Sequence, residues 1–239
     1  MMLTLFFVPN LGLESTVLVG GDEAHHAIKV VRIEIGEELL LADGSGAWVR
    51  GKVSEISKKS FSLDVLERGI EEPRSPEIIV IQALMKSDRA KEAIELLTVA
   101  GATTIIPWQS ERSIAKWQSD LGEKWLNSAT TAAKQSRRLT LPEFEGPITT
   151  SQIIKRFGGT SNLLVLHEGA TTKLSQAIQH LASAPIIVII GPEGGISGEE
   201  LGNFGSAGAS IVVLGNEVFR AAHAGFAAIA AISALTGRW

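Results

Sequence analysis

The chain has 239 residues, which is enough for one large or two small domains, and hydrophobic residues make up 45% of it against 20% charged residues. This balance is typical of a folded protein and excludes wholesale disorder. The net charge of −4 excludes a uniformly basic nucleic-acid binder, and the absence of cysteine excludes disulfides, cysteine-bound metal clusters and a thiol nucleophile.

Residues 1–72 are predicted to form a small β-barrel that carries one helix. Apolar runs of strand length recur in this part, and turn signals such as Asp43-Gly44-Ser45-Gly46 separate them. The helical stretch covers residues 22–32. The expected strands cover residues 3–8, 16–19, 38–41, 47–56 and 60–66.

The composition changes at residues 71–76 (EEPRSP), where two prolines and several charges predict a linker. Downstream, apolar strands alternate with helices, which predicts an α/β domain with a parallel sheet over residues 73–239. The expected strands cover residues 78–84, 103–108, 162–167, 185–190 and 210–214. The expected helices cover residues 88–100, 120–137, 172–182, 198–205 and 217–235.

The apolar start of the chain has no basic segment before it and is interrupted by Pro9, so we interpret it as a strand and not as a signal peptide. The longest apolar run, residues 184–190, is far short of the roughly 20 residues that a membrane helix needs. We therefore expect a cytoplasmic protein that does not bind membranes.

Three expected strands of the second domain are followed at once by glycine or by polar residues, at residues 166–169 (LHEG), 191–195 (GPEGG) and 214–220 (LGNEVFR). Ligands of open parallel sheets bind outside the carboxyl ends of the strands. The middle loop leads into Ser197 and Glu200, whose spacing predicts a capping box at the start of a helix. Neither a dinucleotide fingerprint nor a P-loop occurs here, so these loops suit an uncharged or cationic ligand.

Residues 191–197 (GPEGGIS) and 214–220 (LGNEVFR) together resemble the motifs of the bacterial 16S rRNA uracil-N3 methyltransferases, the RsmE family of the SPOUT superfamily. The stretches at residues 110–113 (SERS) and 132–138 (AAKQSRR) are similar to further segments of this family. In the first domain, His25 or His26, Val31-Arg32, Gly36 and residues 43–46 are similar to its barrel. The resemblance covers nearly the whole chain.

This resemblance implies a C-terminal SPOUT-type sheet with a deep trefoil knot within residues 162–239, and an N-terminal PUA-like barrel that binds RNA. It further implies a homodimer that uses S-adenosyl-L-methionine, needs no metal, and methylates N3 of a specific uridine in 16S rRNA or in the assembled small ribosomal subunit. The chain departs from the family at Ala222 and Val99, where a glutamate is frequent, so a carboxylate role at these positions is in doubt.

The resemblance also assigns candidate site residues. Arg220 is the expected catalytic residue, because a guanidinium near the uracil oxygens stabilises the anion that forms when N3 loses its proton. The expected cofactor-binding residues are Leu166, His167, Glu168, Gly191, Pro192, Glu193, Gly194, Gly195, Leu214, Gly215, Val218, Phe219 and Arg220. Candidates for the base that removes the proton are Glu193, Glu168 and His223, and the choice among them stays open.

RNA contacts are expected where basic residues are in excess. Residues 82–140 contain nine Lys and Arg against six Asp and Glu, whereas residues 1–70 contain seven against ten. Because Lys and Arg contacts to phosphates dominate nucleic-acid affinity, we expect residues 82–140 to face RNA, with help from Arg50 and Lys52. The expected RNA-binding residues are Arg32, Arg112, Lys134, Gln135, Arg137 and Arg138.

Two alternatives remain open at this point. One is a ribose 2′-O RNA methyltransferase of the same superfamily, which identification of the modified nucleoside distinguishes from a uracil-N3 enzyme. The other is a non-catalytic RNA-binding protein, which would bind RNA but no methyl donor.

Overall fold

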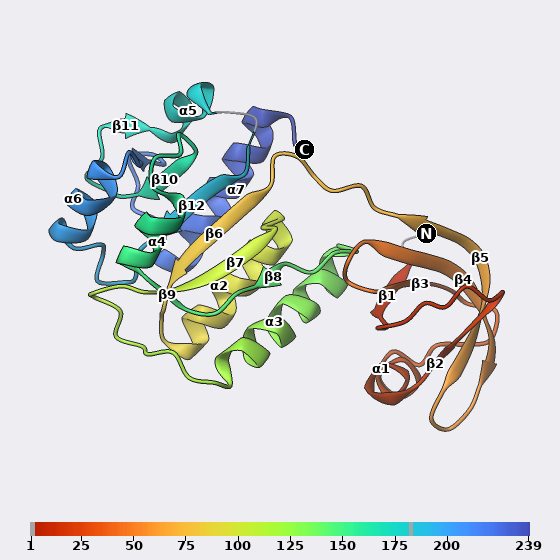
Figure 1. Cartoon of the computed structure of the whole chain (residues 1–239). Helices are drawn as coiled ribbons and strands as arrows, with labels where there is room; N and C mark the ends of the chain where they lie inside the picture. The colour runs from red at the N-terminus through yellow and green to blue at the C-terminus, as the bar shows by residue number, and fades with distance from the viewer. Residues whose placement is uncertain (1–2, 182–183) are drawn as a thin grey trace. The chain divides into compact units, whose positions relative to one another are not determined.

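The computed structural model describes residues 3–181 and 184–239. The chain forms two compact units, the first made of Met1–Pro73 with Thr130–Leu141 and the second of Arg74–Ala129 with Pro142–Trp239. Helix α3 (Leu121–Ser136) contributes residues to both units. The two units are therefore described separately (Figure 1).

The first unit is built on a five-stranded sheet in the order β1-β3-β4-β5-β2. Only β1 and β3 pair in parallel, and the other neighbours are antiparallel. Two register shifts in the long β4–β5 pairing let these strands bend, and Phe6, Leu39 and Phe61 fill the core behind the sheet. The predicted strands are confirmed, as β1 (Thr4–Phe7), β2 (Thr16–Val19), β3 (Glu38–Ala42), β4 (Ala47–Ile56) and β5 (Phe61–Ile70).

The predicted helix at residues 22–32 divides into a short α-helix, α1 (Gly21–His25), and a π-helix, η1 (His26–Val31). Ala24 and Ala27 are completely buried, so the small side chains of this segment pack on the sheet. Arg32 ends the π-helix with a left-handed backbone (φ 61°).

The second unit contains a parallel sheet in the order β11-β13-β10-β12-β6-β7-β8, with β9 also paired to β7 (Figure 1). Every pairing in it is parallel, as the alternation of strands and helices predicted. The main strands are β6 (Ile78–Ala83), β7 (Thr104–Gln109), β10 (Leu163–Leu166), β12 (Ile186–Ile190) and β13 (Ser210–Val213). All five residues of β12 are buried, which explains why its sequence has no polar alternation.

Helices cover both faces of this sheet. The core on one face joins α2 (Ser87–Ala100) and α7 (Ala221–Thr236) to inward residues of β6 and β12 such as Val80 and Val188. The core on the other face joins α4 (Thr150–Phe157) and α6 (Gly198–Ser206) to Ile81 and Ile189. Among residues 3–181 and 184–239, no helix combines the length and apolar character that crossing a membrane requires.

Several elements differ from the sequence-based predictions. Helix α4 and the two-residue strands β8 (Glu143–Phe144) and β9 (Ile148–Thr149) were not predicted, although Thr149 and Gln152 have the spacing of the capping box that α4 uses. The prediction of one helix at residues 172–182 was wrong in its first part. The segment instead forms β11 (Thr172–Lys173), α5 (Leu174–Ala177) and a 3-10 turn η2 (Ile178–His180), and the predicted end of the helix lies outside the described residues.

The last helix begins at Ala221, four residues later than expected. Arg220 is its N-cap residue with extended backbone angles (φ −61°, ψ 147°) and does not belong to the first helical turn. The expectation that Arg220 lies inside the helix was therefore wrong. Because residues 214–219 have no regular structure, the side chain of Arg220 stands at the end of a loop.

Candidate functional site

A cavity of about 590 Å³ lies in the second unit where strands β10, β12 and β13 end. Parallel strands bring their carboxyl ends to one edge of the sheet, and ligands bind at that edge. The three loops singled out in the sequence all line this cavity. Of the expected cofactor-binding residues, the cavity lining includes Leu166, His167, Glu168, Gly191, Pro192, Glu193, Gly195, Leu214, Gly215, Val218, Phe219 and Arg220.

The loop after β12 is fixed in a tight bend. A Cβ atom on Gly191 would lie 2.7 Å from Cγ1 of Ile196, so this position leaves no room for a side chain. Gly195 has a positive φ (+73°), and its N–H donates to the carbonyl of Pro192 at 2.9 Å. The backbone of residues 191–195 therefore forms a tight turn beside the cavity.

The capping box predicted at the end of this loop is confirmed. Ser197 Oγ accepts from the N–H of Glu200 at 3.2 Å, and Glu200 Oε2 accepts from the N–H of Ser197 at 3.3 Å. The other carboxylate oxygen of Glu200 accepts from the N–H of Glu111 at 3.0 Å and from Thr150 Oγ1 at 2.8 Å. Glu200, which is 5% exposed, thus joins the loop after β7 and the start of α4 to the start of α6.

Arg112 and Gly194 contact each other beside the loop after β12. Gly194 is not part of the cavity lining, and a Cβ on it would meet Cβ of Arg112 at an ordinary 3.5 Å. The Arg112 guanidinium donates from Nη1 to the carbonyl of Gly194 at 3.2 Å. In this structure Arg112 supports the loop after β12 from outside the cavity.

The loop after β13 is more exposed. The Val218 and Phe219 side chains are 76% and 44% exposed, yet both line the cavity together with Arg220. The carbonyl of Arg220 accepts from the N–H groups of His223 and Ala224 at 2.9 and 3.0 Å, which begins helix α7. Arg220 is exposed and also lines the cavity, so this residue stands at the cavity rim.

In the third loop, after β10, His167 makes two hydrogen bonds that hold the loop. Its backbone N–H donates to the carbonyl of Val212 at 2.9 Å, and its Nδ1 accepts from the N–H of Gly169 at 3.0 Å. Because Nδ1 is the acceptor, a neutral His167 carries its proton on Nε2. This contact fixes the ring at the edge of the sheet and leaves Glu168 exposed in the cavity lining.

The lining residues missing from the predicted site include Lys86, Arg89 and Ile114, which lie far in the sequence from the three predicted loops. Lys86 and Arg89 follow strand β6, which pairs with β12, so the rule about carboxyl ends would have found them once the strand order was known. The lining contains three basic side chains, Lys86, Arg89 and Arg220. It also contains three carboxylates, Glu168, Glu193 and Glu217.

Among the three candidate bases, Glu168 and Glu193 line the cavity, whereas His223 is outside the lining. His223 Nε2 instead forms a hydrogen bond with Glu92 Oε1 at 2.9 Å. The geometry favours the two glutamates over His223 as groups that meet a substrate. It does not choose between them.

The predicted RNA-binding residues of the first unit have mixed surroundings. Arg32 and Gln135 are exposed, and Lys134 forms an ion pair with Glu23. Arg137 is exposed and donates from Nε to the carbonyl of Leu3 at 3.0 Å. Arg138 is only 9% exposed and donates from Nε to Thr140 Oγ1 at 3.2 Å. Lys134 and Arg138 thus have structural partners within their own unit, and the RNA contacts stay a prediction.

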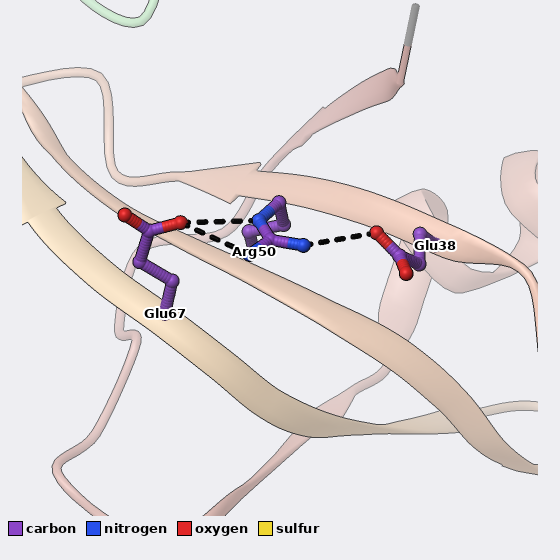
Figure 2. Close-up of polar contacts among 3 residues, drawn as sticks. All are labelled: Glu38, Arg50 and Glu67. Atoms are coloured by element: carbon purple, nitrogen blue, oxygen red, sulfur yellow. Dashed lines mark hydrogen bonds and ion pairs between the residues drawn. The ribbon is translucent and has the colours of Figure 1, made fainter. Parts of the chain in front are cut away.

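Arg50, expected to assist in RNA binding, lies between two carboxylates on the sheet of the first unit (Figure 2). Its guanidinium contacts Glu67 Oε2 at 3.1 Å and Glu38 Oε2 at 3.0 Å. Hydrogen bonds to Glu67 and Glu38 raise the pKa of Arg50 further above its usual value. Two neighbouring negative charges offset its positive charge, so Arg50 adds little attraction for phosphates.

Comparisons with known proteins agree with this geometry. Residues 72–233 match the family described as RNA methyltransferase domain, and residues 19–66 match the RNA methyltransferase PUA domain. The chain is 38% identical over 248 aligned positions to "Ribosomal RNA small subunit methyltransferase E" of Mycobacterium bovis, with 100% of this chain and 94% of the relative covered. The protein of the same name from Synechocystis is 29% identical, with 97% and 77% covered.

A solved structure has a similar fold along nearly the whole chain. It is a ribosomal RNA small subunit methyltransferase E from Neisseria gonorrhoeae bound to S-adenosyl methionine. The TM-score is 0.88 at 27% identity, and the match covers 98% of each chain. This chain belongs to the ribosomal RNA small subunit methyltransferase E family.

Proposed function

We propose that this chain transfers a methyl group from S-adenosyl-L-methionine to N3 of a uridine in 16S rRNA. The observation that carries the proposal is the meeting of three loops, after β10, β12 and β13, around one cavity with Arg220 at its rim. The family membership supports the same reaction class, because relatives with this name are small-subunit rRNA methyltransferases.

The cavity suits the proposed methyl donor. Its lining combines apolar side chains such as Leu166 and Ile190 with the tight backbone bend at Gly191, and its carboxylates favour a positively charged sulfonium. The bound donor supplies an electrophilic methyl group. Glu168, Glu193 and Glu217 face the cavity, so they attract the positive charge of the donor. We further propose that the C-terminal part of this unit is knotted.

Arg220 is the proposed catalytic residue. Uracil N3 carries a proton at neutral pH, and its removal places negative charge on N3 and on the two carbonyl oxygens of the base. A guanidinium at the cavity rim stabilises that charge, and a hydrogen-bond donor of this kind lowers the barrier by about 2.7–4 kcal/mol. Glu168 and Glu193 are the candidates for accepting the proton, since both line the cavity.

RNA is proposed to reach the cavity from the side of its basic residues. Lys86 and Arg89 line the cavity beside Arg220, and Arg112 is exposed on a neighbouring loop. We propose that residues 1–72 form an RNA-binding domain and residues 73–239 the methyltransferase domain. In this proposal Arg32, Gln135 and Arg137 contact RNA from the first unit, and the enzyme works as a homodimer in the cytoplasm.

The test is methylation of small ribosomal subunits that lack the modification, with isotope-labelled S-adenosyl-L-methionine and free 16S rRNA as a second substrate. We expect label in 3-methyluridine, identified after digestion to nucleosides by mass spectrometry. Label in a 2′-O-methylated nucleoside would replace the proposed reaction with ribose methylation. RNA binding without donor binding, measured by calorimetry, would instead indicate a non-catalytic RNA-binding protein.

A further inference from the structure

One carboxylate outside the cavity pairs with a histidine that lies three residues after the proposed catalytic arginine. Glu92 lies on α2 and forms the 2.9 Å hydrogen bond with His223, in the first turn of α7. The hydrogen bond from His223 lowers the pKa of Glu92, and the charges of His223, Arg89 and Arg220 lower it further against partial desolvation. Glu92 is thus a carboxylate that only accepts hydrogen bonds, so His223 Nε2 is the donor.

Of Glu92, His223, Arg89 and Arg220, two line the cavity and two lie outside its lining. Arg89 and Arg220 line the cavity, whereas Glu92 and His223 do not. The Glu92 and His223 side chains are 48% and 41% exposed. Glu92 and His223 therefore act on a bound substrate only through the two arginines.

The packing of α7 on α2 gives this group a fixed geometry. A Cβ atom on Gly225 would lie 2.5 Å from Leu97 Cδ2 and 2.6 Å from Ile190 Cδ1, so α7 approaches α2 and β12 as closely as the backbone allows. Ala222 is buried in one cluster with Met85 and Ala93. Because both helices are locked at these positions, His223 meets Glu92 in a defined register.

Arg220 is coupled to this register through the backbone. Its carbonyl accepts the N–H groups of His223 and Ala224, so the orientation of the first turn of α7 sets where the arginine side chain begins. Arg220 has no side-chain capping bond at this helix start. A cation at a helix N-terminus is unfavourable by itself, and the hydrogen bond between His223 and Glu92 holds a carboxylate against the first turn of this helix.

The cavity lining carries charges of both signs. Lys86, Arg89 and Arg220 line it together with Glu168, Glu193 and Glu217, so the place of Arg220 among these charges depends on what holds it from outside the cavity. We propose that Glu92, held by His223, is a positioning residue that keeps Arg220 at the cavity rim for the reaction. This inference rests on the proposed function, since it assigns Glu92 a role through the proposed catalytic residue.

The kinetic test compares Glu92→Gln with Glu95→Gln. The first variant keeps the size of the side chain but removes its charge, and the control removes a charge on the same helix that pairs with Lys91 at 3.9 Å. We expect Glu92→Gln to lower kcat for rRNA methylation about tenfold with KM for the donor within about twofold, since misplacing a catalytic group impairs the reaction more than binding. Glu95→Gln should match the wild-type chain.

His223→Ala tests the other end of the pair. Alanine is compatible with a half-exposed position of this alanine-rich helix, so the variant should fold. We expect a kcat loss similar to that of Glu92→Gln, and the double variant should lose no more than the larger single effect, because both changes break one contact. Circular dichroism and thermal unfolding verify that each variant is folded. If Glu92→Gln does not fold, the kcat of His223→Ala alone tests the inference.

A spectroscopic readout is independent of catalysis. The Nε–H resonance of Arg220, assigned by its loss in Arg220→Lys, should shift or broaden in Glu92→Gln and in His223→Ala but not in Glu95→Gln. If the wild-type chain does not methylate rRNA, the proposed function fails while this signal still tests the positioning of Arg220. Wild-type kcat together with an unchanged Arg220 resonance in the folded variants would overturn the inference.

Discussion

The loops after β12 and β13 border the same cavity but are held in different ways. In the loop at residues 191–197, Pro192, Ile196 and Ser197 are buried, and Glu200 and Arg112 bind its backbone from two sides. In the loop at residues 214–220, residues 216–220 are all exposed. One loop is fixed by its surroundings, and the other presents its side chains to solvent.

This difference matches the two ligands of the proposed reaction. A small donor gains affinity when its binding backbone is already ordered, because less conformational entropy is lost on binding. A large RNA substrate needs side chains that it can reach, and Val218, Phe219 and Arg220 are accessible on the exposed loop. We infer that both loops border the donor and that the exposed loop in addition presents Arg220 to the target nucleotide.

Arg220→Ala should give the largest effect, and it acts on the exposed loop. If Arg220 stabilises the uracil anion, kcat should fall about 10²–10³-fold, whereas donor affinity and the unfolding temperature should stay close to wild type. Single-turnover methylation of small subunits and calorimetry with S-adenosyl-L-methionine measure the two quantities.

Arg220→Lys serves as the companion variant, because lysine keeps the charge but loses the planar guanidinium. A partial recovery of kcat relative to alanine would show that charge is the main contribution. Near-normal turnover of Arg220→Ala would remove this arginine from the mechanism and would contradict the division of roles between the loops.

Glu200→Gln should weaken the fixed loop most strongly. The side-chain amide cannot accept at both former oxygens, so at least one of the donors on Ser197, Glu111 and Thr150 loses its acceptor. Hydrogen bonds to a charged group contribute about 1.5–3 kcal/mol, and we expect the unfolding free energy to fall by that amount. Glu199→Gln, at an exposed neighbouring position of α6, is the matched control in urea unfolding. Equal midpoints for the two variants would show that the network does not stabilise the loop.

Some of the site was predictable from sequence because its signals are local. Ser197 and Glu200 have the spacing of a capping box, and the structure contains both of its hydrogen bonds. The apolar strands predicted the parallel sheet, and the polar loops after them predicted most of the cavity lining. Such signals lie within a few residues of one another along the chain.

Other features depend on partners that are distant in sequence. Lys86 and Arg89 reach the cavity because β6 pairs with β12, which follows it by roughly a hundred positions, and periodicity carries no information on strand order. Lys134 pairs with Glu23, a structural contact that the sequence pattern does not reveal. The start of α7 was placed too early because Glu217, Val218 and Phe219 are compatible with a helix, while tertiary structure leaves them in the loop.

Gly191→Ala should have a smaller effect than Glu200→Gln and sharpens the contrast within the fixed loop. The added Cβ would meet Ile196 at 2.7 Å, and overpacking of this kind costs about 1–3 kcal/mol. We expect weaker donor binding in calorimetry together with a lower unfolding temperature. Gly194→Ala is the control, because its Cβ would make only an ordinary contact with Arg112. Equal donor affinity of the two variants would show that the bend at Gly191 does not form the donor site.

Arg112→Ala should give the smallest effect, and it separates two roles of one side chain. Loss of the hydrogen bond to the Gly194 carbonyl should weaken donor binding only about twofold, since an exposed hydrogen bond contributes about 0.5 kcal/mol. If Arg112 also contacts a phosphate, the slope of log affinity for RNA against log salt should fall by about one unit. Lys116→Ala, an exposed basic residue on the same loop, is the control for general charge loss. A changed donor affinity with an unchanged salt slope would assign Arg112 to the fixed loop alone.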